Sequence, residues 1–325
     1  MNRFGRIFNI QIFGESHGNA VGMLIDGVPP GIFLVEKHFV HKMSKRKPGA
    51  VGTTARVEDD KVNIVSGVYR DFTTGAPCLL TIDNKNTAPS DYDRFQLHFR
   101  PGHSDFTSFR KSEGFADFRG GGHFSGRLTS ALVAAGVVAK KIIPKIDIKC
   151  KILTVGGVED YADLLLKAKN EGDSLGALLE CTVSKVPIGL GEPFFDSVES
   201  VLSHLLFSIP GIKGVEFGSG FASASMFGSD YNDLILDASG RTKTNNSGGI
   251  NGGIANGNPI VFRVAARPTS SIGKPQETYN FETFKIETLE IGGRHDVCFG
   301  LRLPAVIEAV TAIALADLIL LNSSI

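Results

Sequence analysis

Side chains suited to chemistry gather in short glycine-flanked segments of this chain, and the first is Phe13–Gly18 (FGESHG). A histidine held in a tight loop at the end of a strand can donate a proton, because its unperturbed pKa is about 6.5. Ser16 and His17 are adjacent and point opposite ways in an extended chain, so they do not form a nucleophile–base pair. The segment alone fits equally well a loop histidine that caps backbone groups.

A second segment, Arg100–Asp105 (RPGHSD), combines a cation, a histidine and a carboxylate. Asp105 follows His103 closely enough to orient its ring. Arg100 supplies a fixed cation suited to a carboxylate or a phosphate. The alternative is an exposed polar turn, which the Pro-Gly step favours.

The third segment, Arg119–Thr129 (RGGGHFSGRLT), places a run of glycines before the start of a helix. Free N–H groups and the positive end of the helix dipole make such a place an anion site. Arg119 and Arg127 flank it, and the segment does not match the GxxxxGK[ST] phosphate loop of nucleotide-binding proteins. The alternative is close packing of the loop, which needs the glycines but not the polar residues.

The fourth segment, Gly292–Cys298 (GGRHDVC), contains Arg294 and Asp296, which share a face if the chain is extended. An arginine beside a carboxylate keeps that carboxylate ionised and able to act as a base. The alternative is a surface ion pair worth less than about 1 kcal/mol. Gly218–Ser223 (GSGFAS) resembles a dinucleotide-binding fingerprint only faintly and is not followed by a predicted helix.

The charge balance argues against a nucleic-acid partner. Lys+Arg and Asp+Glu each total 34 in the 325 residues, so the formal net charge is zero, whereas a nucleic-acid binder usually has a basic excess or stripe. The one basic cluster, His41–Lys47 (HKMSKRK), has two interpretations. It is either a solvated helix end or an anion site facing a phosphorylated substrate.

Cysteine usage and hydropathy predict a cytoplasmic protein that does not span a membrane. The cysteines are far apart, without a CxxC pair, so they signal neither a metal site nor a redox dithiol; they are Cys78, Cys150, Cys181 and Cys298. The first residues lack an apolar signal segment. The longest apolar stretch, Pro304–Leu321, contains Glu308 and Asp317 and falls short of about 20 clean apolar residues, so we expect a buried helix there.

Periodicity and turn residues predict the elements that position these segments. Strands are predicted at 5–13, 20–25, 61–69, 77–82, 175–186, 214–227, 234–237 and 259–266, and helices at 36–47, 127–143, 160–168, 197–209 and 304–321. Residues 95–117 show no sustained period and are expected to form a long irregular segment, which is usually functional. Short hairpin-like turns favour a mixed α/β (α+β) fold with antiparallel sheets over a doubly wound parallel sheet. We expect one domain over 1–325, with internal duplication as an open alternative.

Seven motifs in order resemble the chorismate synthase family from end to end. They are FGESHG, RPGHSDF, DFRGGG, SIPGIKGVEFGSGF, NNSGGINGGIANG, RPTSS and GGRHD. The resemblance implies an anti-1,4 elimination of phosphate from 5-enolpyruvylshikimate 3-phosphate, giving chorismate with reduced FMN and no net redox change. It also implies a β-α-β sandwich with internal pseudo-symmetry and a homotetramer. It leaves open whether NADPH reduces the flavin on this protein or reduced flavin is supplied from elsewhere.

The resemblance also assigns roles to residues. His17 corresponds to the histidine that protonates reduced flavin, His103 to the one that assists phosphate departure, and Asp296 to the carboxylate near flavin N5 that relays the lost proton. Ser125 joins them as a catalytic candidate. The flavin-contact positions fall on His123, Phe124, Ser125, Pro210, Gly211, Gly252, Arg267, Pro268, Thr269, Ser270, Ser271 and Arg294. Charge logic makes Arg46, Arg119, Arg127 and Arg302 candidates for substrate anions.

The chain departs from the commonest family spelling near the third segment. Many members read GGGRSSARET where this chain reads GGGHFSGRLT, so His123 and Phe124 replace Arg-Ser while Ser125 is kept. The other departures are Val51 for arginine, Arg267 for lysine and Val297 for proline. Arg127 could supply the displaced positive charge, and we predict that Arg127→Ala weakens the binding of FMN or substrate.

Two rival functions remain at this level. One is a flavin-binding paralogue that acts on another phosphorylated substrate, which the altered GGGHFSGRLT segment would support. The other is an RNA-binding or scaffold protein, against which the neutral charge argues. Anaerobic incubation with substrate and reduced FMN separates the three functions.

Overall fold

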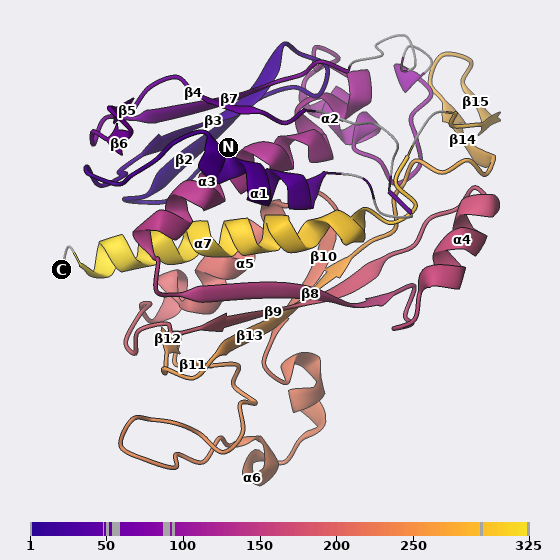
Figure 1. Ribbon diagram of the computed structural model, residues 1–325. Coiled ribbons are helices and arrows are strands. Elements are labelled where there is room, and N and C mark those ends of the chain that lie inside the picture. Colours follow the sequence, from indigo (N-terminus) through magenta and orange to yellow (C-terminus); the bar gives the residue numbers. More distant parts are fainter. Residues whose placement is uncertain are drawn as a thin grey trace.

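The computed structural model describes residues 2–47, 49, 52–53, 59–86, 92, 95–292 and 295–323. Two antiparallel sheets enclose a layer of helices (Figure 1). One sheet has the strand order β1-β2-β3-β7-β4, and the other has the order β10-β13-β9-β8. The predicted β-α-β sandwich with antiparallel sheets is therefore confirmed.

The strands are β1 (Arg3–Phe4), β2 (Asn9–Gly14), β3 (Ala20–Asp26), β4 (Val62–Ile64), β5 (Val68–Tyr69), β6 (Phe72–Thr73), β7 (Cys78–Asp83), β8 (Asp147–Val155), β9 (Ala177–Ser184), β10 (Ile212–Phe217), β11 (Ile250–Asn251), β12 (Ile254–Ala255), β13 (Ile260–Ala266), β14 (Gln276–Asn280) and β15 (Lys285–Leu289). The α-helices are α1 (Lys37–Arg46), α2 (Asp105–Lys111), α3 (Thr129–Ile142), α4 (Ala162–Asn170), α5 (Val198–Ser208), α6 (Gly228–Tyr231) and α7 (Leu303–Asn322). Short 3-10 helices are η2 (Arg119–Phe124), η3 (Gly126–Leu128), η4 (Phe194–Asp196), η5 (Gly220–Ser225) and η6 (Phe299–Arg302).

The long apolar helices α3 and α7 form the middle of the sandwich. α3 packs against β3 and β7, α7 packs against β8, and the two helices pack against each other (Figure 1). A helix that is apolar on every side is buried in a core, and most residues of both helices are buried. One helix among the described residues, Phe299–Asn322, is long and apolar enough to cross a membrane. Because 78% of its most apolar window is buried inside the protein, the predicted core helix is confirmed.

Gly136 allows the two central helices to approach closely. A Cβ built on Gly136 would lie 2.4 Å from the Cβ of Ala309 on α7. We therefore expect Gly136→Val to lower the free energy of unfolding by about 1–3 kcal/mol, because the added methyl groups overfill a packed core. Urea denaturation measures the change. Gly228→Ala is the control, since a Cβ at Gly228 meets nothing within 4 Å. Equal stability of the two variants would contradict the prediction.

Several predicted elements are wrong in detail, and tertiary contacts explain the first. The strand predicted at 5–13 is interrupted, because the buried Asp317 carboxylate on α7 accepts hydrogen bonds from the N–H groups of Arg6, Ile7 and Phe8. Gly5, with a φ of 94°, begins this turn.

The other differences concern segments with weak local patterns. Residues 95–117, predicted to be irregular, contain α2. The strand predicted at 214–227 ends at Phe217, and residues 234–237 contribute an isolated bridge between Ile235 and Thr242 rather than a strand. The edge strand β8 and the β14–β15 hairpin were not predicted.

Candidate active site

A cavity of about 870 Å³ opens where η2, η3 and the starts of α3 and α7 meet the loop between α5 and β10. This volume falls in the range of small-molecule sites. Among the described residues, seven cationic side chains line it against two carboxylates. The cations are Arg3, Arg46, Arg100, Arg127, Lys213, Arg267 and Arg302, and the carboxylates are Asp60 and Asp296. The excess of positive charge favours an anionic ligand.

The fold brings most of the residues predicted for the site to this cavity. Those that line it are Arg46, His103, His123, Phe124, Ser125, Arg127, Pro210, Gly211, Arg267, Thr269, Ser270, Ser271, Asp296 and Arg302. Arg294 and Val51 lie outside the described residues.

His103 is held by a buried ion pair at the edge of the cavity. Its Nδ1 lies 2.6 Å from Oδ1 of Asp105, and Arg100 donates to both oxygens of Asp105 at 2.7 and 2.8 Å. Burial would raise the pKa of Asp105, but hydrogen bonds from Arg100 and His103 outweigh it and hold that pKa well below its usual range. The ionised carboxylate only accepts, so we assign the Nδ1 proton to this contact and leave Nε2 for proton transfer.

Burial also affects the imidazole itself. It lowers the pKa of His103; the hydrogen bond with Asp105 opposes this shift, and the positive charges of Arg100 and Arg267 add to it. His103 without a ligand is therefore mainly neutral near pH 7. A bound phosphate dianion would favour the protonated ring and raise its pKa again.

His17 lies behind the glycine run rather than on the cavity wall. Its ring packs edge-on against Tyr92 with a centroid distance of 5.0 Å, while the adjacent Ser16 lines the cavity. A Cβ on Gly120 would come within 2.4 Å of the His17 ring, and a Cβ on Gly121 would come within 3.3 Å of His103. The glycine run therefore fits between the two candidate histidines, and only residues without a Cβ allow this approach.

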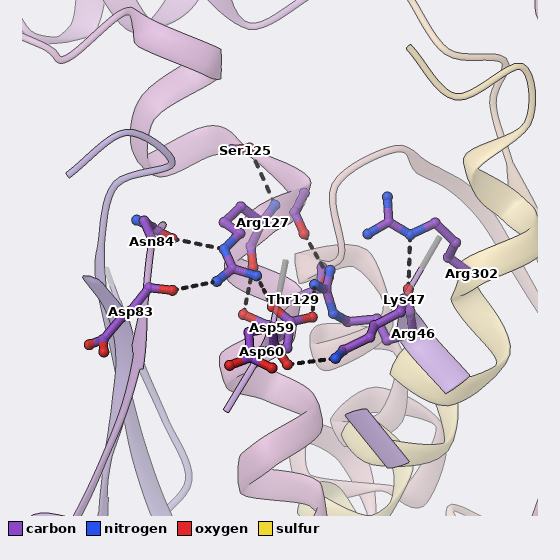
Figure 2. Close-up of polar contacts among 12 residues, drawn as sticks. Arg46, Lys47, Asp59, Asp60, Asp83, Asn84, Ser125, Arg127, Thr129 and Arg302 are labelled. Atoms are coloured by element: carbon purple, nitrogen blue, oxygen red, sulfur yellow. Dashed lines mark hydrogen bonds and ion pairs between the residues drawn. The ribbon is translucent and has the colours of Figure 1, made fainter. Parts of the chain in front are cut away.

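The floor of the cavity holds a buried cluster of two arginines and one aspartate (Figure 2). Asp60 accepts from Nη2 of Arg46 at 2.8 Å and from Nη1 of Arg127. Arg127 also donates through Nε to Oδ1 of Asn84 at 2.8 Å and to the carbonyl of Asp83 at 3.2 Å. Asp60 was not predicted, because an aspartate within a charged run (EDDK) gives no local signal of a buried partner.

Asp296 and Arg302 form a second ion pair on the cavity wall. Nη1 of Arg302 lies 3.0 Å from Oδ2 of Asp296, and both side chains are mostly buried. Nε of Arg302 donates to the carbonyl of Arg46 at 2.9 Å, which joins the end of α1 to the start of α7 (Figure 2). The pair places a carboxylate and a guanidinium together on the cavity wall.

His123 and Phe124, which differ from the commonest family motif, lie in the loop 119–125, and His123 anchors that loop. Nδ1 of His123 lies 2.8 Å from the carbonyl of Gly14, and its Nε2 lies 3.1 Å from Oδ1 of Asn2. His123 therefore ties the loop to β2 and to the start of the chain. The hydroxyl of Ser125 accepts from the N–H of Arg127 and caps η3, while Phe124 stays partly exposed on the cavity wall.

Another part of the wall is formed by residues of the segment 267–271 and by the Pro210-Gly211 step. The N–H of Arg267 donates to the carbonyl of Gly211 at 3.0 Å, and Ser271 accepts from Arg100 at 3.1 Å. Gly211 has a φ of 90°, and a Cβ there would lie 2.3 Å from the ring of Phe299. Burial lowers the pKa of Arg267.

Besides His17, three predicted residues among those described do not line the cavity. Gly252 sits in the turn between β11 and β12, where a Cβ would meet nothing within 4 Å. Arg119 points to Asp117, with which it makes two hydrogen bonds at 2.8 Å, and its side chain is 37% exposed. Pro268 belongs to the wall segment, but it is its neighbours that line the cavity.

Comparisons with known proteins agree over nearly the whole chain. A family model described as "Chorismate synthase" matches residues 8–320. A chorismate synthase from Chitinophaga pinensis is 55% identical over 323 residues, covering 99% of this chain and 97% of that protein. One from Aeropyrum pernix is 42% identical, covering 99% and 93%. A solved structure described as "Crystal Structure of Chorismate Synthase" matches with a TM-score of 0.73 at 24% identity, covering 98% of this chain and 93% of that chain, and shows the same fold.

Proposed function

The chain belongs to the chorismate synthase family of lyases, and from this premise we propose that it converts 5-enolpyruvylshikimate 3-phosphate to chorismate and phosphate. The proposed reaction is an anti-1,4 elimination with reduced FMN as cofactor and no net redox change. The observation that supports it best is the cationic cavity with His103 and Asp296 on its walls. A substrate with one phosphate and two carboxylates needs such a surplus of positive charge.

The residues present fit a flavin phosphate and a second anion. The cavity is large enough for a ligand of that size, and the arginines on its wall are donors suited to phosphate oxygens. We propose that the walls formed by His123–Ser125, Pro210-Gly211 and Arg267–Ser271 hold FMN. When bound, reduced FMN supplies electron density to the substrate ring as phosphate leaves and recovers it as the hydrogen departs.

Each protein group has a separate proposed task in this reaction. Nε2 of His103 holds the proton that the departing phosphate takes, and Asp105 fixes the ring for that transfer. Asp296, paired with Arg302, is the proposed carboxylate that helps relay the proton lost from the ring. His17 is the proposed proton source on the cofactor side. Ser125 is the remaining catalytic candidate, and its observed contact is the cap of η3.

Anaerobic incubation with 5-enolpyruvylshikimate 3-phosphate and chemically reduced FMN tests the proposal. Formation of chorismate and one equivalent of phosphate is expected. Flavin binding without turnover would instead support a paralogue that acts on another phosphorylated substrate, and loss of both would support a non-enzymatic role. A parallel reaction with oxidised FMN and NADPH shows whether the protein reduces its own flavin.

We also propose that residues 1–325 form one domain and that the protein is a cytoplasmic homotetramer. One hydrophobic core contains residues from both sheets, which supports a single domain. The segment 218–249 projects beyond the four-stranded sheet near α6 (Figure 1). It exposes large apolar side chains, including Phe221 at 81% and Phe227 at 80%. Exposed apolar clusters of this kind mark interaction surfaces and support self-association.

We expect the double variant Phe221→Ser/Phe227→Ser to form a smaller assembly than the wild type, because it loses apolar area that association would bury. Light scattering coupled to gel filtration measures the mass. Phe284→Ser is the control, since Phe284 is 74% exposed in the β14–β15 hairpin. An unchanged mass of the double variant would contradict a role of this segment in assembly.

A further inference from the structure

Asp60 stands out among the residues around the cavity because two arginines share its carboxylate (Figure 2). Oδ2 contacts Arg46 and Oδ1 contacts Arg127, and the side chains of all three are 1–5% exposed. Asp60 has a φ of 50°, a conformation that residues with a side chain adopt rarely. Tertiary contacts must therefore hold this conformation.

Each arginine has further partners that fix its plane. Arg127 is held on its other side by Asn84 and by the carbonyl of Asp83 at the end of β7. Nη1 of Arg46 lies 3.4 Å from Oγ1 of Thr129, at the start of α3. Both arginines line the cavity, although they come from the end of α1 and from η3. Asp60 is the group that joins them.

The charges in this cluster do not cancel. One carboxylate between two guanidinium groups leaves one positive charge at the cavity floor. Arg302 adds a third guanidinium near Arg46, but it is paired with Asp296. Burial lowers the pKa of Arg46 to about 10, with smaller contributions from Arg302 and Arg127, and only Asp60 opposes the shift. The carboxylate therefore keeps Arg46 charged as well as in place.

We propose that Asp60 is a positioning residue, which holds Arg46 and Arg127 together as a receptor for one oxyanion of the bound ligands. Two fixed guanidinium groups bind a phosphate or carboxylate with less ordering on binding than two mobile ones. The proposal rests on the proposed function, since the anion belongs to the substrate or to FMN. The alternative is a buried ion-pair cluster that only stabilises the fold.

Asp60→Asn tests the charge of this residue and Asp60→Glu tests its position. We expect Asp60→Asn to raise the KM for 5-enolpyruvylshikimate 3-phosphate at least about tenfold, because the two guanidinium groups lose their common anchor. It should also move to lower pH, by about one unit or more, a second alkaline limb of kcat/KM that reports loss of the Arg46 proton near pH 10 and lies above the His103 limb, because the pKa of Arg46 falls. Asp60→Glu should keep that limb, since the charge remains, and still raise KM, since the carboxylate moves.

Glu308→Gln is the matched control. Glu308 is a mostly buried carboxylate on α7 that pairs with Lys42 at 2.6 Å, outside the cavity. We expect it to leave KM and the pH profile unchanged. Melting temperatures of all variants record the structural contribution of each carboxylate separately.

Calorimetry identifies the anion and does not depend on turnover. Shikimate 3-phosphate, shikimate and FMN are titrated into the wild type and Asp60→Asn. Loss of affinity for shikimate 3-phosphate alone assigns the receptor to the substrate phosphate. Loss for both shikimates assigns it to the ring carboxylate, and loss for FMN alone assigns it to the flavin phosphate.

The proposal is overturned if Asp60→Asn lowers only the melting temperature while KM, the alkaline limb and all three affinities stay at wild-type values. If Asp60→Asn does not fold, Asp60→Glu decides, and an unchanged KM and unchanged affinities in that variant overturn the proposal. Absence of chorismate formation by the wild type would count against the proposed function instead. In that case the calorimetric affinities alone show whether Asp60 positions the two arginines for an anion.

Discussion

His103→Ala is expected to lower kcat for chorismate formation by about 10²- to 10⁴-fold, the range for loss of a positioned general acid. Asp105 orients the ring of His103, and Arg100 holds Asp105 in place. The ring is therefore positioned for proton transfer at Nε2 before the substrate binds. Stopped-flow measurement of single turnovers with reduced FMN gives the rate. His38→Ala is the control, because His38 on α1 also has a lowered pKa but lies outside the cavity.

The pH dependence of kcat and of kcat/KM should report the protonation of His103. The acid form of His103 is required, so the rate falls as pH rises through its pKa. Because the protein without ligand has a lowered pKa at His103, the limb in kcat/KM should lie below about 6.5. The bound phosphate raises the pKa, so the limb in kcat should lie at higher pH. His103→Ala should lack both limbs, and wild-type rates in that variant would remove His103 from the mechanism.

Arg127→Ala is expected to destabilise the fold and to weaken ligand binding. It removes a 5% exposed side chain that pairs with Asp60, Asn84 and the carbonyl of Asp83. We expect a loss of about 3 kcal/mol in the free energy of unfolding, because a buried carboxylate loses one of its two partners. Binding of FMN or substrate should weaken as well. Urea denaturation and calorimetry measure the two effects.

Arg119→Ala is the natural comparison, since Arg119 and Arg127 flank the same glycine run. Arg119 is half-buried, pairs with its neighbour Asp117 and does not line the cavity. Its loss should cost less than about 1 kcal/mol and leave ligand affinity unchanged. If the two variants behave alike, the distinction that we draw between these arginines is wrong.

These two arginines also show where inference from sequence reaches its limit. Both are cations beside glycines and receive the same assignment from charge logic. Their difference comes from partners that are two residues away for Arg119 and 67 residues away for Arg127. Gly252 shows the same limit of prediction. Its motif matches the family, but its β11–β12 hairpin does not line the cavity.

The family, the antiparallel sandwich and the elements with strong local patterns could be predicted from the amino-acid sequence. α5 and α7 follow from apolar residues in helical spacing with clear end signals, and β3 and β13 follow from strand patterns closed by turn residues. Most of the residues that the seven motifs and the charge logic predicted for the site also line the cavity. These predictions rest on local residue patterns or on the order of the motifs along the chain.

The polar groups that meet in the interior could not be predicted in this way, because they come from distant parts of the chain. Asp317 interrupts the first predicted strand from 311 residues away, and Asp60 joins Arg46 to Arg127 across two separate parts of the chain. A buried carboxylate must find donors wherever the fold provides them, and that choice depends on desolvation and packing rather than on neighbouring residues. For this reason Asp60, which leaves no mark in the local sequence pattern, becomes visible only when α1, η3 and β7 are brought together.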